Sequence, residues 1–400
     1  MLKRRSVQMN ILFAMPWDQR IGGVTHVASS LGHILEARGH RAMFLFPAED
    51  GLRIKAHTSL RGFPALYCRL RNFPPERPTW RARVSWYSAA FTALPQLVPY
   101  GLLQHVDLIN VHYPGDGFAL MADLARWLRV PLVVSAHGSD LLPDAGPSRG
   151  NGLRRLLDSA DAVVVPSHDY LRTVVDAFPS LGNKIRCIHN GYDEEELSVA
   201  ASVNGSYSSD VTALCIAALI HKKGIDVLLQ ALAQCRSNRL KLRLVGDGPL
   251  REQLESLTAM LRLSDRVSFL GMKDRDEVCR ELARCDLLVL PSRHPSESFG
   301  LAALEAMACG KAVVASALGG LPELVDDRAT GLLVRPEDPT DLAAALDLLV
   351  DDAQLRAKLG AAGRSKATRF TARRAAEVYE GLFKELVARA TRAGAPVHHR

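Results

Sequence analysis

Residues 291–316 of this 400-residue chain read PSRHPSESFGLAALEAMACGKAVVAS, and this stretch predicts a strand, a loop, a helix and a second strand. The apolar run Asp286 to Leu290 is typical of a buried strand, and Lys311 to Ala317 begins another. Gly310 suits a helix C-terminus, so we expect the helix over Leu301 to Cys309. A helix between two buried strands indicates a parallel sheet with helices on its faces.

Two glutamates flank the start of this helix. Glu297 lies in the loop before it, and Glu305 lies on the helix itself. The backbone N–H groups of Phe299, Gly300 and Leu301 would form a positively polarised helix N-terminus, which suits a phosphate. Two carboxylates beside an anion site indicate a phosphorylated polyol as the ligand.

Similar alternation of β-branched runs and helical patterns continues along most of the chain, and 400 residues exceed one usual hydrophobic core. We therefore predict an α/β fold of two Rossmann-like, doubly wound domains that face a cleft. The small, polar stretch near residues 201–210 is the expected linker. The predicted order is a first domain (1–200), the linker (201–210), a second domain (211–370) and a C-terminal amphipathic helix (371–392). The predicted strands are 10–15, 42–46, 107–112, 132–136, 162–165, 185–189, 211–217, 241–245, 267–270, 286–290, 312–315 and 331–334.

The composition is that of an ordinary globular protein, with 48% hydrophobic and 23% charged residues. No stretch reaches the roughly 18 uninterrupted apolar residues of a membrane span, and the N-terminal region lacks a signal-peptide pattern. We therefore expect a cytoplasmic protein. The seven cysteines are scattered without a Cys-x-x-Cys pair, so we expect reduced, mostly buried thiols and no structural zinc.

The net charge of +7 is concentrated in one segment. Residues 51–85 contain eight basic residues and one acidic residue, Glu76. Aromatic residues are interleaved with them as far as Tyr87. This mixture predicts contact of residues 51–87 with an anionic membrane surface, which would make the protein peripheral on the inner face of the cytoplasmic membrane. A solvated loop packed by a few aromatics is the alternative. Nucleic acid is not expected, because no binding motif accompanies the charge.

Candidate site residues of the first domain follow predicted strands. Gly22 and Gly23 open a helix and let the backbone approach a ligand closely, although a tight turn is the alternative. No Gly-x-Gly-x-x-Gly follows this strand, so a nicotinamide dinucleotide is disfavoured. His137 and His112 each lie at the ligand-binding end of a strand, where either a functional or a structural histidine fits the pattern.

In the second domain, Lys222 and Lys223 precede a predicted helix and can reach an anion at its start. A solvated loop charge is the alternative. Asp274 and Asp276 form an Asp-x-Asp that superficially matches a metal site. We interpret the pair as acidic residues at a helix start, which favour the helix dipole, and expect no metal.

Taken together, these segments resemble the retaining nucleotide-sugar glycosyltransferases of glycosyltransferase family 4, which have the GT-B architecture. The similarity extends over nearly the whole chain, and the paired glutamates are its most specific part. The segments that carry it are Gly22-Gly23, Arg38-Gly39-His40, His137-Gly138, His189-Asn190-Gly191-Tyr192-Asp193, Lys223-Gly224, Val245 to Pro249, Glu297 to Glu305, and Gly319-Gly320-Leu321-Pro322-Glu323.

The resemblance implies roles for individual residues. Glu297 would accept hydrogen bonds from the donor sugar, Glu305 would bind the nucleotide ribose, and Lys223 would contact the diphosphate. His137 would lie by the sugar near the acceptor. The remaining implied donor-binding residues are Gly22, Gly23, Lys222, Gly246 and the amides of Phe299, Gly300 and Leu301.

One position departs from the family pattern. Relatives commonly carry an arginine five residues before the lysine, where this chain has Ala218. The charge of the leaving group would then rest on Lys223, the helix dipole, and Lys222 or His221. Loss of one charge-assisted hydrogen bond, about 1.5 to 3 kcal/mol, need not abolish activity when another cation substitutes.

The function implied is metal-independent transfer of a sugar, with retention, from a UDP- or GDP-sugar to a saccharide or lipid-linked acceptor in cell-envelope or exopolysaccharide biosynthesis. No cofactor beyond the nucleotide sugar is expected. Two alternatives remain at this stage: a GT-B epimerase or phosphorylase, and a non-catalytic nucleotide-sugar-binding protein, which Ala218 motivates.

Overall fold

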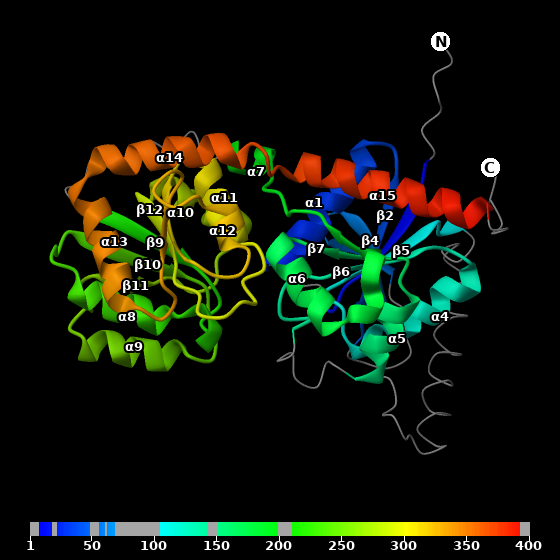
Figure 1. Cartoon of the computed structure of the whole chain (residues 1–400), viewed down its shortest axis with the longest axis horizontal. Helices are drawn as coiled ribbons and strands as arrows, with labels where there is room; N and C mark the ends of the chain where they lie inside the picture. Colours follow the sequence, from blue (N-terminus) through cyan, green and yellow to red (C-terminus); the bar gives the residue numbers. More distant parts are fainter. Residues whose placement is uncertain are drawn as a thin grey trace, which may run out of the picture. The chain divides into compact units, whose positions relative to one another are not determined.

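The computed structural model describes residues 8–17, 22–48, 56–60, 62–68, 105–142, 150–198 and 210–392 (Figure 1). The chain divides into two compact units. Unit 1 comprises residues 1–166, 170–188 and 375–400, and unit 2 comprises residues 167–169 and 189–374. The last helix, α15 (Ala372–Arg392), therefore begins in unit 2 and returns the chain to unit 1.

The described part of unit 1 contains a sheet with the strand order β3-β4-β2-β1-β5-β6-β7-β8. All neighbours are parallel except β3, which runs antiparallel to β4. The strands are β1 (Asn10–Ala14), β2 (Arg41–Pro47), β3 (Ala56–Leu60), β4 (Phe63–Cys68), β5 (Leu108–His112), β6 (Leu132–Ser135), β7 (Ala162–Val165) and β8 (Ile185–Cys187).

Helices cover both faces of this sheet, which explains why its central strands read as nearly continuous apolar runs. One face buries Ile109 and Val111 under α4 (Ala119–Leu128), α5 (Asn151–Ser159) and α6 (His168–Ala177). The opposite face buries Phe13 and Phe44 under α1 (Gly23–Ala37) and α15. The short helices η2 (Asp116–Phe118) and η4 (Pro179–Lys184) complete the described elements of this unit.

Unit 2 contains a fully parallel sheet with the order β11-β10-β9-β12-β13-β14. Its strands are β9 (Val211–Ile216), β10 (Leu240–Val245), β11 (Val267–Phe269), β12 (Leu287–Leu290), β13 (Ala312–Ser316) and β14 (Leu332–Val334). Helices α8 (Ile225–Gln234), α9 (Arg251–Met260) and α13 (Pro339–Asp351) pack on one face. Helices α10 (Arg275–Arg284), α11 (Leu301–Ala308) and α12 (Leu321–Leu324) pack on the other.

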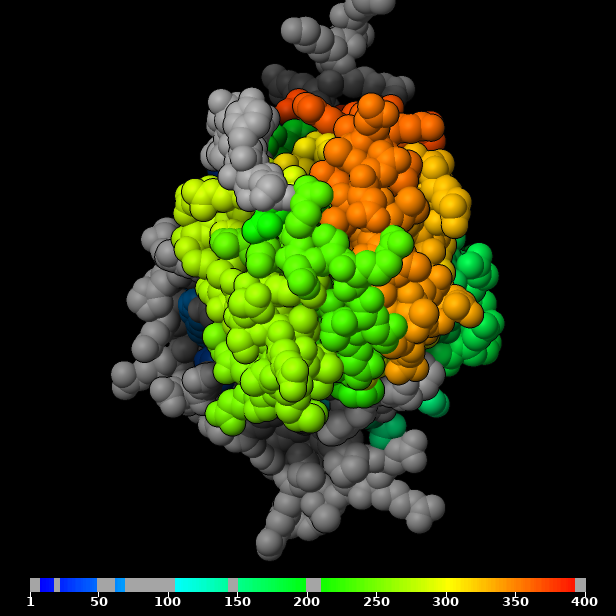
Figure 2. Space-filling model, turned by 90° about the vertical axis from the view of Figure 1, so that its left-hand side faces the viewer, coloured from blue at the N-terminus to red at the C-terminus, as the bar shows by residue number. Residues whose placement is uncertain are grey.

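The remaining described elements of unit 2 are α7 (Glu194–Ser198), η6 (His221–Lys223) and α14 (Ala353–Ala367). On the surface shown in Figure 2, α9, α8 and α13 lie side by side, with α14 next to α13. The predicted helix Leu301 to Cys309 is confirmed to within one residue, because α11 ends at Ala308 and Gly310 adopts the left-handed φ of +71°. The predicted α/β fold of two parallel, Rossmann-like sheets is confirmed.

The structure changes the interpretation of the basic, aromatic segment 51–87 in the part of it that is described. Residues 56–60 and 63–68 are not a loop but the strands β3 and β4. Phe63 is buried in the core, so its ring is not available to a membrane surface, and the partly buried Tyr67 packs on Phe46. Residues 51–55, 61 and 69–87 lie outside the described part of the chain. No described helix combines the length and apolarity needed to cross a bilayer.

The cysteines agree with the sequence prediction. All seven are free thiols, and five of them are buried. Burial raises the pKa of Cys215 to about 12 and that of Cys68 to about 11, so these thiols stay protonated at neutral pH.

A cluster of charged side chains holds α15 to unit 1. The Glu380 carboxylate, 5% exposed, accepts hydrogen bonds from Arg38 Nε (2.6 Å) and His40 Nε2 (3.0 Å), and also from Lys384. His40 Nδ1 accepts the backbone N–H of Met9, which leaves Nε2 as the donor. The Arg38-Gly39-His40 segment therefore has a structural explanation in this chain: it supplies two donors to Glu380.

We predict that Glu380→Gln destabilises unit 1. Burial raises the pKa of Glu380, but Lys384, His40 and Arg38 outweigh this and lower it to about 2. The ionised carboxylate thus stabilises the fold above its unfolded pKa of about 4.5, and the stabilisation is lost as the pH falls toward 2. In urea unfolding at pH 7, the variant should lose about 1.5 to 3 kcal/mol.

The matched control is Glu377→Gln, one turn earlier on α15. Glu377 is half-exposed and reaches only Arg38, at 3.5 Å, so its replacement should change stability by less than about 0.5 kcal/mol. Equal urea midpoints for the two variants would contradict this explanation of how α15 is held.

Candidate active site

The central strands of unit 2 define a topological switch point. Parallel neighbours β9 and β12 lie side by side, and the chain proceeds from β9 toward β10 on one side and from β12 toward β13 on the other. Ligands of doubly wound sheets bind outside the carboxyl ends of strands at such a point. Lys223 follows β9, in η6, and Glu297 follows β12.

Lys223 and Glu297 form an ion pair in this loop cluster. Lys223 Nζ lies 2.6 Å from Glu297 Oε2, and Ser292 Oγ donates to the same oxygen at 2.8 Å. The Glu297 side chain is 12% exposed. Burial raises its pKa, but Lys223 and Ser292 outweigh burial, so the pKa lies below its ordinary value. Glu297 is therefore an ionised hydrogen-bond acceptor. The sequence predicted both residues but not their pairing.

The loop that carries Glu297 leads into α11. Gly300 is the N-cap, with a left-handed φ of +87°, and its lack of a side chain leaves the first N–H groups of α11 without a side-chain cap. Leu301 is the first residue of the helix, and Phe299 is buried 5.7 Å from the ring of Phe370. The amides of all three residues thus lie at the helix start, as predicted from the sequence.

Gly319 and Gly320 support the same loop by close approach. Gly320 N donates to Glu297 O at 3.0 Å. A Cβ at Gly319 would lie 2.3 Å from Glu297 O, and one at Gly320 would lie 2.2 Å from Ser298 O. Because any side chain would displace the loop, these glycines are needed to keep Glu297 in place.

A third cation, Arg293, lies beside Lys222 in this loop cluster, although position 218 holds alanine in place of the expected arginine. Arg293 N donates to Lys222 O at 3.0 Å, and its guanidinium donates to His221 Nε2 and to Asp226 Oδ2, each at 2.7 Å. Asp226 therefore neutralises Arg293. His221 Nε2, as an acceptor from a guanidinium, carries no proton there. Lys222 favours the ionised form of Glu297 and so adds positive potential at the site.

Glu305 forms a second ion pair, which the sequence did not predict. Its side chain is buried, and Arg275 Nη2 lies 2.6 Å from Glu305 Oε1 while Arg275 Nε donates to Glu196 Oε2 at 2.6 Å. Burial raises the pKa of Glu305, and Arg275 only partly opposes it. Asp274, which precedes Arg275 and superficially matched a metal site in the sequence, caps α10 in a capping box with Glu277. No local pattern relates Arg275 to Glu305, because they lie 30 positions apart on different helices.

Gly246, another predicted donor-binding residue, lies just after β10. Its φ is +135°, and its N–H donates to Gly271 O at 2.9 Å. A Cβ there would lie 2.0 Å from Ala217 O, at the end of β9. Gly246 therefore lets the loops after β9 and β10 approach each other.

Unit 1 has its own switch point between β1 and β5. Gly22 follows β1 as the N-cap of α1, with a φ of +148° that favours glycine, and a Cβ there would meet no atom of the described residues within 4 Å. Gly23 begins α1. The first turn of this helix thus lies at the ligand-binding end of the sheet.

His137 lies beyond β6, in a loop that Asp140 organises. The backbone N–H groups of His137 and Gly138 donate to the Asp140 carboxylate at 2.8 Å each. Tyr170 donates its hydroxyl to Gly138 O. On the other side, His137 Nε2 lies 3.0 Å from Nδ1 of His112, at the end of β5. The structure therefore brings the two candidate histidines of unit 1 into contact.

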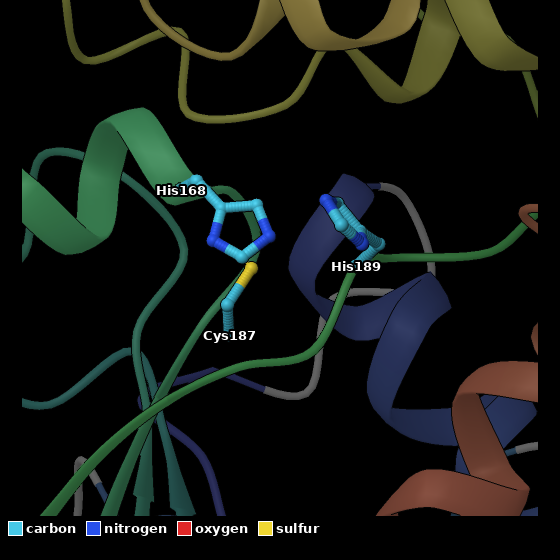
Figure 3. A group of neighbouring side chains, drawn as sticks. All are labelled: His168, Cys187 and His189. Carbon is cyan, nitrogen blue, oxygen red and sulfur yellow. The ribbon is translucent and has the colours of Figure 1, made fainter.

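His189 belongs to unit 2. The sequence predicted it within a strand over 185–189, but β8 ends at Cys187. Figure 3 shows His189 near His168 and Cys187. Its ring contacts that of His168 edge-on at 5.4 Å, and its Nε2 lies 3.3 Å from Glu323 Oε2. Burial raises the pKa of Glu323, but backbone N–H groups and His189 outweigh it and lower the pKa. Glu323 thus has a structural explanation within unit 2.

Comparison with known proteins agrees with this geometry. Residues 21–196 match the family described as Glycosyltransferase Family 4, and residues 200–366 match Glycosyl transferases group 1. The chain belongs to the group 1 glycosyltransferases and has the GT-B fold. It is therefore a glycosyltransferase by family.

Individual relatives extend over most of the chain. D-inositol 3-phosphate glycosyltransferase of Stackebrandtia nassauensis is 34% identical over 71% of this chain and 69% of the relative. N-acetyl-alpha-D-glucosaminyl L-malate synthase of Bacillus anthracis is 28% identical over 92% of this chain and 95% of the relative. The solved structure of HepE from Anabaena in complex with UDP has a TM-score of 0.71, with 23% identity over 94% of this chain and 100% of that one.

We predict that His112 and His137 stay neutral at physiological pH. Burial disfavours the imidazolium, which lowers the pKa of His137 to about 4 and that of His112 well below its ordinary value. In an NMR titration of the ring resonances, neither histidine should change between about pH 8 and pH 5.5. A midpoint near the ordinary value of about 6.5 for either ring would contradict its burial.

Proposed function

We propose that this protein is a retaining, metal-independent glycosyltransferase. It transfers a hexosyl group from a UDP- or GDP-sugar to a saccharide or lipid-linked acceptor. The observation that carries the proposal is the partly buried Lys223–Glu297 pair beside the start of α11, which has no side-chain cap, at the switch point of unit 2. A cation, a carboxylate and free amide donors together match a sugar diphosphate.

Each part of the pair has a separate role in the proposal. Glu297 accepts hydrogen bonds from the donor sugar hydroxyls, because it is ionised and held by Ser292. Lys223 exchanges its contact with Glu297 for the diphosphate. The amides of Phe299, Gly300 and Leu301 bind the remaining diphosphate charge, with Lys222 and Gly246 as further contacts.

Stabilisation of the departing diphosphate is the chemical demand of this reaction. Preorganised N–H donors and lysines supply it where negative charge develops, without a need for a metal ion. Retention follows in the proposal from departure and attack on the same face of the sugar. His137 of unit 1 lies by the sugar, and Glu305 binds the nucleotide ribose.

The relatives support this choice of substrates by their names. HepE was solved with UDP, which favours a nucleoside diphosphate as the leaving group. The two curated relatives are named for inositol phosphate and malate acceptors. Both names indicate a polar acceptor, whereas the saccharide or lipid-linked acceptor of envelope or exopolysaccharide biosynthesis at the cytoplasmic membrane face is proposed from the basic segment 51–87 and not from these relatives. The basic residues within 51–87 support an anionic membrane surface as a further partner.

We predict that Glu297→Ala and Lys223→Ala lower kcat by about 100-fold or more, because Glu297 contacts the transferred sugar and Lys223 contacts the departing diphosphate. The measurement is release of nucleoside diphosphate in the presence of a nucleotide sugar and acceptor. The matched controls Glu252→Ala and Lys358→Ala change exposed helix residues of unit 2 and should retain activity. Normal turnover in Glu297→Ala would exclude this site.

We also predict that EDTA leaves transfer unchanged, because the charge of the leaving group is carried by Lys223, Lys222 and the α11 amides. Full loss of activity in EDTA, restored by a divalent cation, would contradict the metal-free scheme. The same assay separates the alternative reaction, since a sugar-nucleotide epimerase converts the donor without releasing nucleoside diphosphate.

A further inference from the structure

Unit 1 contains a run of buried polar side chains on a face that is otherwise apolar. Asn110 and His112 alternate along β5, and Ser135 ends the neighbouring strand β6. All three are fully buried, on the face that also carries Leu108 and Val133. Buried polar groups without partners are costly, so their partners must be accounted for.

The run forms one directed chain of hydrogen bonds. Tyr379, on α15, donates its hydroxyl to Ser135 Oγ at 3.2 Å, and Ser135 Oγ donates to Asn110 Oδ1 at 2.9 Å. The Asn110 amide nitrogen then lies 2.9 Å from His112 Nε2. An amide nitrogen only donates, so His112 Nε2 must accept.

The same logic extends to His137. Burial lowers the pKa of His112, so its ring is neutral, and its single proton must be on Nδ1. Nδ1 lies 3.0 Å from His137 Nε2, which is therefore the acceptor. The neutral ring of His137 then carries its proton on Nδ1. Phe13 packs beside His112 at 5.7 Å and limits its reorientation.

We propose that Asn110 and His112 are positioning residues that fix the ring orientation and the tautomer of His137, so that His137 acts through Nδ1–H as a donor. This rests on the proposed function, in which His137 lies by the donor sugar. Because Nε2 is committed to His112, His137 does not serve as a base through that nitrogen. The chain of bonds thus selects a hydrogen-bond donor for the sugar.

The test reads the tautomers directly. In long-range ¹H–¹⁵N NMR of the full-length protein without substrate, both His112 and His137 should show a protonated Nδ1 and an unprotonated Nε2. Free histidine prefers the opposite tautomer, so an unperturbed ring would give the reverse pattern. A protonated Nε2 on His137 in the wild-type protein overturns the proposal.

Variants then separate positioning from mere stability. His112→Phe keeps an aromatic ring but removes the donor, so His137 should shift to the Nε2–H tautomer and kcat should fall about 10- to 100-fold, with KM for the donor within about threefold. His112→Asn restores an N–H donor on a short side chain and should recover part of kcat and the original tautomer. An unchanged His137 tautomer and kcat in His112→Phe would overturn the proposal.

The matched control is Asp107→Asn, just before β5. Asp107 accepts the backbone and side-chain N–H groups of Asn10 at 2.7 and 2.9 Å, so the variant weakens the same strand without contacting the chain of bonds. It should leave the tautomers and kcat unchanged, and a change of tautomer there overturns the proposal. Absence of transfer by the wild-type protein with every nucleotide sugar would refute the proposed function, whereas the tautomers are judged on the protein alone.

Discussion

The strand order of each sheet is the constraint on which the candidate residues depend. In unit 2 the chain leaves β9 and β12 in opposite directions, so the loops that carry Lys223 and Glu297 meet at their carboxyl ends. In unit 1 the same reversal falls between β1 and β5. There it places Gly22 and His112 at the carboxyl ends of β1 and β5, with His137 in the loop after the neighbouring strand β6. Separate stretches of sequence thereby supply one compact set of groups in each unit.

Electrostatic pairing then sets the protonation state of the carboxylates among these groups. Burial raises the pKa of both Glu297 and Glu305, yet Lys223 outweighs this effect for Glu297, whereas Arg275 does not for Glu305. Removal of either cation would leave a buried charge without compensation, which is far more costly than loss of an exposed pair. Arg293 does not take the place of the arginine expected at position 218, because its guanidinium is paired with Asp226. In the proposed function, the lysines and the start of α11 therefore carry more of the diphosphate charge.

Local sequence patterns were sufficient for the strands, for α11 and for the placement of Glu297 before it, because burial and capping are local properties. They were insufficient for β3 and β4, which lie within the basic, aromatic segment 51–87 that predicted membrane contact or a loop. Partners distant in sequence were also missed. The contact of Arg275 with Glu305 and the chain from Tyr379 to His137 depend on packing between elements. The interpretation of Asp274 and Asp276 as acidic residues at a helix start, by contrast, agrees with the capping box of α10. The sequence predicted candidate site residues, and the tertiary structure shows which groups contact them.

The central claim is that the pair Lys223–Glu297 marks the binding site of a nucleoside diphosphate. Calorimetric titration of the wild-type protein, Lys223→Ala and Lys358→Ala with UDP and GDP tests it most directly. We expect the wild-type protein and Lys358→Ala to bind at least one of these nucleotides with equal affinity, and Lys223→Ala to bind it about tenfold or more weakly. Equal affinity in all three proteins, or no binding by the wild-type protein, would contradict the claim.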